Sequence, residues 1–102
     1  MRLCFSAEAK ADLAQIWQDT ADRWSVSQAD IYREHLMTQI RALCDTPTLG
    51  KPVSGHPELR SMSFNRGRNR DGHLVVYRVD ESEQQIVILR FFHTKQNWPE
   101  QI

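Results

Sequence analysis

Residues 72–93 read GHLVVYRVDESEQQIVILRFFH, and this stretch decides the fold. Two runs rich in β-branched and aromatic residues, His73 to Val79 and Ile86 to Phe92, flank the polar segment Asp80 to Gln85. Runs of this composition are typical of β-strands, and a short polar segment between them predicts an antiparallel connection. We therefore expect the second half of the chain to form an antiparallel sheet.

An amphipathic helix precedes these strands near the N-terminus. Ser6 is a good N-cap, and from Ala7 to Trp24 apolar residues recur every three or four positions. Such a stripe is the face that a helix buries against another layer. The polar positions that we expect to face solvent are Glu8, Asp12, Gln15, Asp19 and Asp22.

A second helix follows at once. Ser25 and Ser27 offer caps, the apolar spacing continues from Ala29 to Leu43, and Pro47 forbids continuation. The connection between the helices is only a few residues long. The two helices are therefore expected to pack as an antiparallel hairpin.

The remaining segments complete the predicted order of elements. Residues 2–5 fit a short first strand, residues 46–57 an irregular connector, and Met62 and Phe64 a strand that ends in a turn over residues 65–72. A helical hairpin and a short meander each leave one apolar face wet unless they pack together. We predict an α+β fold: a short N-terminal strand and an antiparallel helical hairpin packed on a mainly antiparallel, three- to four-stranded sheet.

Side chains of the two deciding strands should alternate between the faces of the sheet. In the first strand the expected sets are Leu74, Val76 and Arg78 against Val75, Tyr77 and Val79. In the second strand they are Ile86, Ile88, Arg90 and Phe92 against Val87, Leu89, Phe91 and His93. If Arg78 and Arg90 lie on the face away from the helices, that face mixes cations with apolar residues and suits a binding surface.

Composition excludes several classes of protein. With 102 residues, 40% hydrophobic and 25% charged, the chain fits one globular domain spanning residues 1–102. Thirteen basic and thirteen acidic residues cancel, so no net field attracts nucleic acid or an anionic membrane. No segment resembles a membrane helix or a signal peptide, and we expect a cytoplasmic protein without membrane contact.

The cysteines and histidines do not predict a cofactor or a metal site. Cys4 and Cys44 are spaced for neither zinc nor a redox pair, so we interpret both as reduced, buried side chains. The four histidines show no pairing at ligand spacing. We expect neither a cofactor nor a metal.

Local positive charge gathers in the strand-forming half. Arg60, Arg66, Arg68 and Arg70 lie close together in sequence. These cations, with Arg78 and Arg90, are either solvated and paired on an open face or form a site for an anion or an acidic partner.

The combined pattern resembles the ParE/RelE superfamily of bacterial toxins from type II toxin–antitoxin modules, in particular its ParE branch. The resemblance covers nearly the whole chain. It rests on Ala11-Asp12-Leu13 with Ile16, on Pro47 and Gly50, on Leu59-Arg60-Ser61, and on the two strands 72–79 and 86–93, with His73 four residues before Tyr77-Arg78 and His93 closing Leu89-Arg90-x-x-His93. The fold that this family implies is the fold predicted above.

The resemblance implies one of two activities. ParE-like members inhibit DNA gyrase by binding it, without a catalytic residue of their own, whereas RelE-like members cleave messenger RNA on the ribosome. A nuclease needs a base, an acid and cations, for which the candidates are His93, Arg90 and Arg78 with Arg60 in support. Zero net charge and Leu74, where RelE-like toxins often place an arginine, favour the ParE reading. Arg60, Arg78, Arg90 and His93 are then candidates for target binding, and no catalytic residue is assigned.

The family also implies partners. A cognate ParD-like antitoxin is expected along the helical hairpin and the sheet, and operator DNA is contacted only through the antitoxin. Trp24, Tyr32 and Trp98 could anchor a protein partner, although helical spacing favours the core for Trp24 and Tyr32. A third alternative is a non-toxic subunit that serves only in assembly or as a corepressor.

Overall fold

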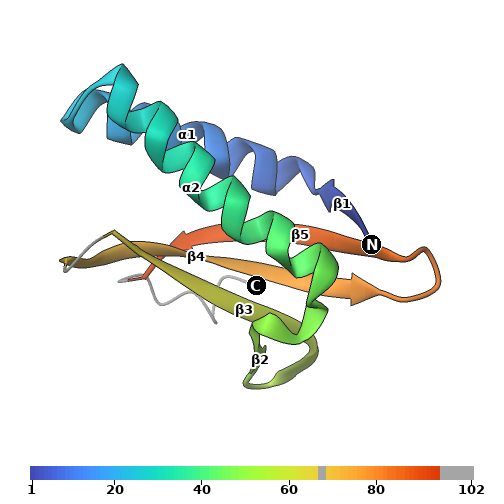
Figure 1. Ribbon diagram of the computed structural model, residues 1–102. Coiled ribbons are helices and arrows are strands. Elements are labelled where there is room, and N and C mark those ends of the chain that lie inside the picture. The colour runs from blue at the N-terminus through green and yellow to red at the C-terminus, as the bar shows by residue number, and fades with distance from the viewer. Residues whose placement is uncertain (67–68, 95–102) are drawn as a thin grey trace.

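The computed structural model describes residues 1–66 and 69–94, with the backbone alone for residues 65, 66 and 69–71. It has two layers, because both helices cover one face of a single five-stranded sheet (Figure 1). The elements in chain order are β1 (Arg2–Phe5), α1 (Ala7–Arg23), α2 (Val26–Asp45), the short 3-10 helix η1 (Pro47–Leu49), β2 (Lys51–Val53), β3 (His56–Arg66), β4 (Asn69–Asp80) and β5 (Gln85–His93). The predicted α+β class and order are confirmed.

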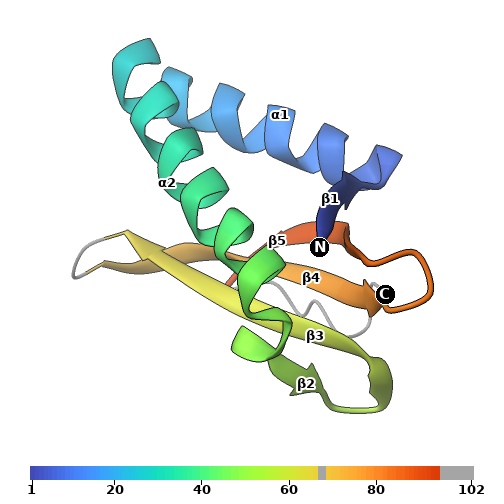
Figure 2. The same cartoon turned by 45° about the vertical axis from the view of Figure 1, so that its right-hand side comes forward.

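Both helices begin at the serines that the sequence indicated. The Ser6 hydroxyl accepts a hydrogen bond from the Ala9 N–H at 3.0 Å, and the Ser25 hydroxyl accepts one from the Gln28 N–H at 3.1 Å. Each cap satisfies an N–H group that has no partner inside its helix. From the short connection between them the helices diverge: α1 runs over β5, and α2 crosses toward β3 (Figure 2).

The sheet has five strands where three or four were expected, and two of its strands extend further than expected. Its order is β1-β5-β4-β3-β2, with β1 parallel to β5 and the other pairs antiparallel. Within the predicted connector, β2 pairs only with β3, and an edge strand of this kind tolerates Pro52. The ladder between β3 and β4 also continues into the predicted turn, since pairing uses backbone groups that polar residues carry too.

Hydrophobic side chains cover both faces of the sheet. The larger cluster lies between the sheet and the helices and includes Ile16, Tyr32, Leu36, Ile40, Leu43, Phe64, Val75, Tyr77, Ile86, Ile88 and Phe91. A second cluster lies on the other face and comprises Val53, Leu59, Leu74, Val76 and Phe92. The predicted alternation along β4 is therefore confirmed.

Along β5 the predicted alternation is wrong beyond Ile88. Val76 pairs with Arg90, but the next residue, Tyr77, pairs with Ile88, so Leu89 is an extra residue in a β-bulge. A bulge of one residue reverses the faces of all that follows. Phe91 consequently packs with Ile88 under the helices, and Phe92 lies on the opposite face.

Two sequence expectations about burial are also wrong. Trp24, expected in the core, is 63% exposed because α1 ends at Arg23 and Trp24 is its C-cap, whereas Tyr32 is buried as expected. Cys4 is exposed and Cys44 half-buried, both as free thiols. Cys4 follows Leu3 on a strand whose alternate residues face the core, which leaves Cys4 outward.

Candidate functional site

Two histidines meet near the start of β4 and at the end of β5. His73 pairs with His93 across the ladder, and their rings lie edge to face with centroids 5.4 Å apart. The Nδ1 atom of His73 lies 2.7 Å from the Tyr32 hydroxyl of α2. Alternation with Val75 and Tyr77 on β4 places His73 on the face covered by the helices.

His73 is neutral at physiological pH. Burial, with a smaller effect of nearby His93, lowers its pKa to about 4, while the Asp19 carboxylate acts in the opposite direction. Burial penalises a positive charge on the His73 ring itself, and a charge on His93 would repel it. The ring is therefore a neutral hydrogen-bonding partner for Tyr32.

Arg90 is held by a carboxylate of α1. Its Nε donates to Asp12 Oδ2 at 2.7 Å and its Nη2 to Asp12 Oδ1 at 3.2 Å, while the Phe91 N–H also donates to Oδ2 at 2.9 Å. The guanidinium carbon lies 4.8 Å from the centre of the Phe92 ring. The hydrogen bond to Asp12 is the main reason that the pKa of Arg90 is raised.

Asp12 was expected to face solvent, but its carboxylate is directed at the bulge of β5. Its position in the sequence could have indicated this, because Asp12 lies three residues after Ala9 and four before Ile16, and both of these residues are buried on the same face of the helix. Sequence reasoning also passed over His73 and Asp19 as site residues. His73 could have been recognised because it lies two residues before Val75, a core residue, and therefore on the same face of the strand.

These side chains surround a pocket of about 280 Å³ between α1 and the end of β5. We call it the α1–β5 pocket. Its lining residues are Asp12, Gln15, Ile16, Asp19, His73, Arg90, Phe91, Phe92 and His93. It brings together two of the residues singled out from the sequence, Arg90 and His93.

Arg60 lies apart from this pocket. Its Nη1 donates to the Gly50 carbonyl at 2.7 Å, beside the hydroxyl of Tyr77, which donates to the Pro47 carbonyl at 2.7 Å and accepts from the Gly50 N–H at 2.9 Å. Burial raises the pKa of Tyr77, against smaller opposing effects of Gly50 and Arg60. Arg60 therefore helps to hold η1 and β2 on the sheet.

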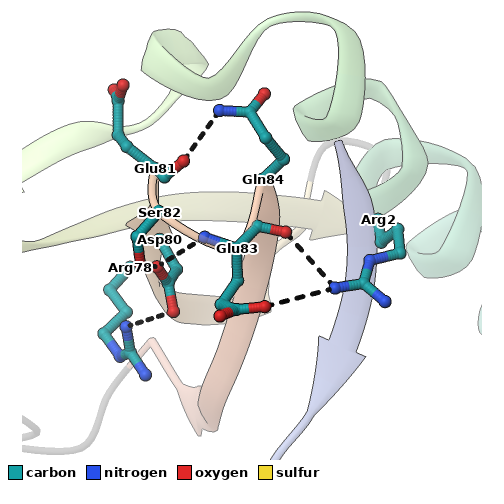
Figure 3. A network of polar contacts seen from close by, with 7 residues as sticks. All are labelled: Arg2, Arg78, Asp80, Glu81, Ser82, Glu83 and Gln84. Carbon is teal, nitrogen blue, oxygen red and sulfur yellow. Dashed lines mark hydrogen bonds and ion pairs between the residues drawn. The ribbon is translucent and has the colours of Figure 1, made fainter.

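Arg78 also lies elsewhere, near the turn between β4 and β5 (Figure 3). Its Nη1 is 3.6 Å from Asp80 Oδ2. Arg2 of β1 contacts Glu83, which belongs to the same turn. Hydrogen bonds from Ser82 and from the Glu83 N–H lower the pKa of Asp80, with a smaller contribution from Arg78. The arginine-rich run of Arg66, Arg68 and Arg70 and the tail with Trp98 lie outside the described side chains.

A larger groove lies on the other flank of α1, between the two helices. It measures about 670 Å³, and the indole Nε1 of Trp17 donates to Asp30 across it at 2.9 Å. We call it the hairpin groove. Its lining residues are Phe5, Lys10, Leu13, Ala14, Trp17, Gln18, Asp30, Arg33 and Met37.

Two further findings concern metal ions and membranes. Within residues 1–66 and 69–94, no three His, Cys, Asp or Glu side chains gather as metal ligands would. None of the helices in the described part of the chain combines the length and hydropathy needed to cross a membrane.

Known proteins share this sequence pattern and this fold. Residues 3–98 match the family described as the ParE toxin of type II toxin–antitoxin systems. The chain is 34% identical over 92 residues to "Toxin ParE1" of Caulobacter vibrioides, covering 90% of this chain and 88% of that protein. It is 32% identical over 95 residues to "Toxin ParE1" of Mycobacterium tuberculosis H37Rv, covering 92% and 90%.

Solved structures agree on the fold. The chromosomal ParDE system of P. aeruginosa matches with a TM-score of 0.71 and 22% identity, covering 93% of this chain and 97% of that one. The intact E. coli RelBE toxin–antitoxin complex matches with a TM-score of 0.68 and 14% identity, covering 93% and 98%. With a family match over nearly its whole length, this chain belongs to the ParE toxins of type II toxin–antitoxin systems.

Proposed function

We propose that this toxin inhibits DNA gyrase by binding it and has no catalytic residues of its own. The observation that carries the proposal is the pairing of Arg90 with Asp12 at 2.7 Å, which neutralises the arginine that lines the same pocket as His93. Arg60 and Arg78 make their polar contacts elsewhere. The three candidate arginines therefore do not converge as the cations that phosphodiester cleavage requires beside its base and acid.

The choice of DNA gyrase as the target rests on the family resemblance. ParE-like toxins are gyrase inhibitors, and a chain with thirteen basic and thirteen acidic residues suits a protein surface better than ribosomal RNA. Trp24, between the two helices, is 63% exposed and could serve as an aromatic anchor. Arg78 and His93 remain further candidates for contacts with the target.

We further propose that the cognate antitoxin occupies the hairpin groove. The groove is walled by apolar side chains such as Leu13, Trp17 and Met37, and Lys10 and Arg33 also line it. These features suit an amphipathic segment whose apolar stripe is flanked by acidic residues. Operator DNA would then be bound by the antitoxin, and the complex would act in the cytoplasm.

One observation favours the alternative of a RelE-like ribonuclease. His73 and His93 stand 5.4 Å apart, centre to centre, beside the pocket that Arg90 lines. Two imidazoles can divide the roles of base and acid. A toxin that has lost activity and serves only as a corepressor subunit is a third possibility, and harmless expression without antitoxin would favour it.

The deciding experiment measures gyrase supercoiling and DNA cleavage with the purified toxin, titrated with and without the antitoxin encoded beside it. We expect loss of supercoiling and accumulation of cleaved DNA, both reversed by the antitoxin. Unchanged gyrase together with ribosome-dependent cleavage of messenger RNA would overturn the proposal in favour of the nuclease.

A substitution of His93 separates the same two functions. His93→Ala should abolish RNA cleavage if His93 transfers a proton, whereas loss of one contact at a binding surface lowers gyrase inhibition only by a modest factor. His35→Ala, at an exposed position of α2, is the control.

A further inference from the structure

We propose that the α1–β5 pocket receives a lysine or arginine side chain from the target protein. This inference rests on the proposed function, because it identifies the chemistry by which the target would be recognised. It assigns a role to Asp19 and Gln15, which neither the sequence pattern nor the family resemblance singles out.

With both of its histidine rings neutral, the pocket carries a net negative charge. The carboxylate of Asp12 is compensated by Arg90, with which it shares two hydrogen bonds of 2.7 and 3.2 Å. Burial keeps the His73 ring neutral, with a pKa of about 4. While the His93 ring is also neutral, Asp19 contributes a carboxylate that no cation among the described lining residues compensates, and a basic group complements it.

The hydrogen-bonding groups of Asp19 suit a cation. Its Oδ1 accepts from the Gln15 amide at 2.8 Å, which fixes the orientation of the carboxylate. Its Oδ2 accepts no hydrogen bond from the described residues. A guanidinium or ammonium group entering from solvent can donate to this oxygen, and charge-assisted bonds of this kind are the stronger class.

The shape of the pocket fits one long side chain. Its volume of about 280 Å³ lies just below the range typical of small-molecule sites, about 300–1,000 Å³. Ile16 and Phe91 contribute apolar wall, against which the methylene stem of lysine or arginine can pack while its charge reaches Asp19. Arginine in particular is enriched among the residues that dominate binding energy at interfaces.

The same charges disfavour a phosphate. A phosphate group in this pocket would meet the Asp19 carboxylate, while the guanidinium that could attract it is already bound by Asp12. Repulsion between like charges opposes such binding. The geometry therefore points to a protein partner and away from an RNA backbone.

The pocket and the hairpin groove lie on opposite flanks of α1. Asp12, Gln15 and Asp19 repeat at helical spacing on one flank, and Lys10, Ala14 and Trp17 on the other. Binding of the target in the pocket and of the antitoxin in the groove can therefore be separated by substitution. Asp22 provides a matched control, because Gln18 donates to it at 2.8 Å just as Gln15 donates to Asp19, and it does not line the pocket.

The first test compares Asp19→Lys with Asp22→Lys in the gyrase assay. We expect Asp19→Lys to raise the toxin concentration for half-inhibition about thirtyfold or more, the size of an interface hot spot, and Asp22→Lys to change it less than about twofold. Antitoxin affinity and melting temperature should stay the same in both. Unchanged inhibition by Asp19→Lys, or an equal loss of antitoxin binding, would overturn the inference.

The second test does not depend on gyrase. The toxin labelled with nitrogen-15 is titrated with N-acetyl-arginine amide while amide chemical shifts are recorded. We expect saturable shifts around Asp19 and His93 that Asp19→Lys abolishes and Asp22→Lys retains. No shifts at millimolar ligand, or the same shifts with inorganic phosphate, would refute the pocket. Wild-type toxin without effect on gyrase would instead refute the proposed function, and this titration would still decide the pocket.

Discussion

At the scale of single residues, the pairing of Asp12 with Arg90 is the contact with the largest consequences. It joins α1 to the bulge of β5, and the side chains are only 18% and 34% exposed. Arg78 differs, since its ion pair with Asp80 is longer, at 3.6 Å, and the Arg78 side chain is 43% exposed. Two arginines on neighbouring strands therefore differ in what they contribute to the fold.

Arg90→Ala should destabilise the protein by about 1–2 kcal/mol, because it removes two charge-assisted hydrogen bonds and leaves Asp12 without its cation. Arg78→Ala, which removes only one long ion pair of a half-exposed arginine, should leave the free energy of unfolding nearly unchanged. Urea unfolding of both variants measures the difference. Equal losses would contradict the structural role of the Asp12 contact.

His73 makes stability depend on pH. Its pKa is about 4 in the folded protein and near 6.5 in the unfolded chain, so the unfolded state takes up the proton first as the pH falls. The contribution is complete above pH 6.5 and lost by about pH 4, which amounts to roughly 1–3 kcal/mol after allowance for partial exposure.

This dependence can be isolated with His73→Gln, which cannot titrate but can still hydrogen-bond to Tyr32. Unfolding free energies are measured at several values between pH 4.5 and pH 7. The variant should lose less stability over this range than the wild type. Parallel curves would show that His73 does not titrate differently in the two states.

At the scale of elements, the start of α1 and the bulge of β5 form one unit. The Ser6 hydroxyl accepts from the Ala9 N–H and donates to the Leu89 carbonyl at 2.7 Å, and the Ser6 N–H donates to Ile88. A bulge leaves backbone groups without ladder partners, and here the helix cap satisfies one of them. The position of α1 and the faces of β5 are thus set together.

Ser6→Ala should therefore cost more than an ordinary cap. We expect about 2 kcal/mol, from about 1 for the cap and about 1 for the bond to Leu89. Ser25→Ala, at the exposed cap of α2, should cost about 0.5–1 kcal/mol. Thermal or urea unfolding compares the two, and the expectation fails if Ser25→Ala is the more damaging.

At the scale of the whole molecule, the two flanks of α1 divide the surface. The hairpin groove lies between α1 and α2, and the α1–β5 pocket lies between α1 and the end of β5 that carries His93. A toxin that must be both active and neutralisable can use one surface for each partner. Antitoxin binding need not then cover the residues that contact the target.

The antitoxin assignment predicts the effect of a charge placed in the hairpin groove. Ala14→Glu should weaken antitoxin binding about tenfold or more, because the longer side chain fills the groove and repels an acidic partner. Ala11→Glu, also at an exposed position of α1 but outside the groove lining, should have little effect. Calorimetric titration with the purified antitoxin measures both affinities, and equal weakening would argue against the groove.

The sequence by itself determined the helices, their serine caps, the strands from His73 onward and the α+β class, since periodicity and capping act between residues a few positions apart. Only the tertiary structure decided which way β5 faces after Ile88, because the bulge at Leu89 depends on the register with β4 and on Ser6. The tertiary structure also decided which carboxylate pairs with Arg90. Asp12 is 78 residues away in sequence, and no local pattern on β5 specifies a partner that the packing of α1 provides.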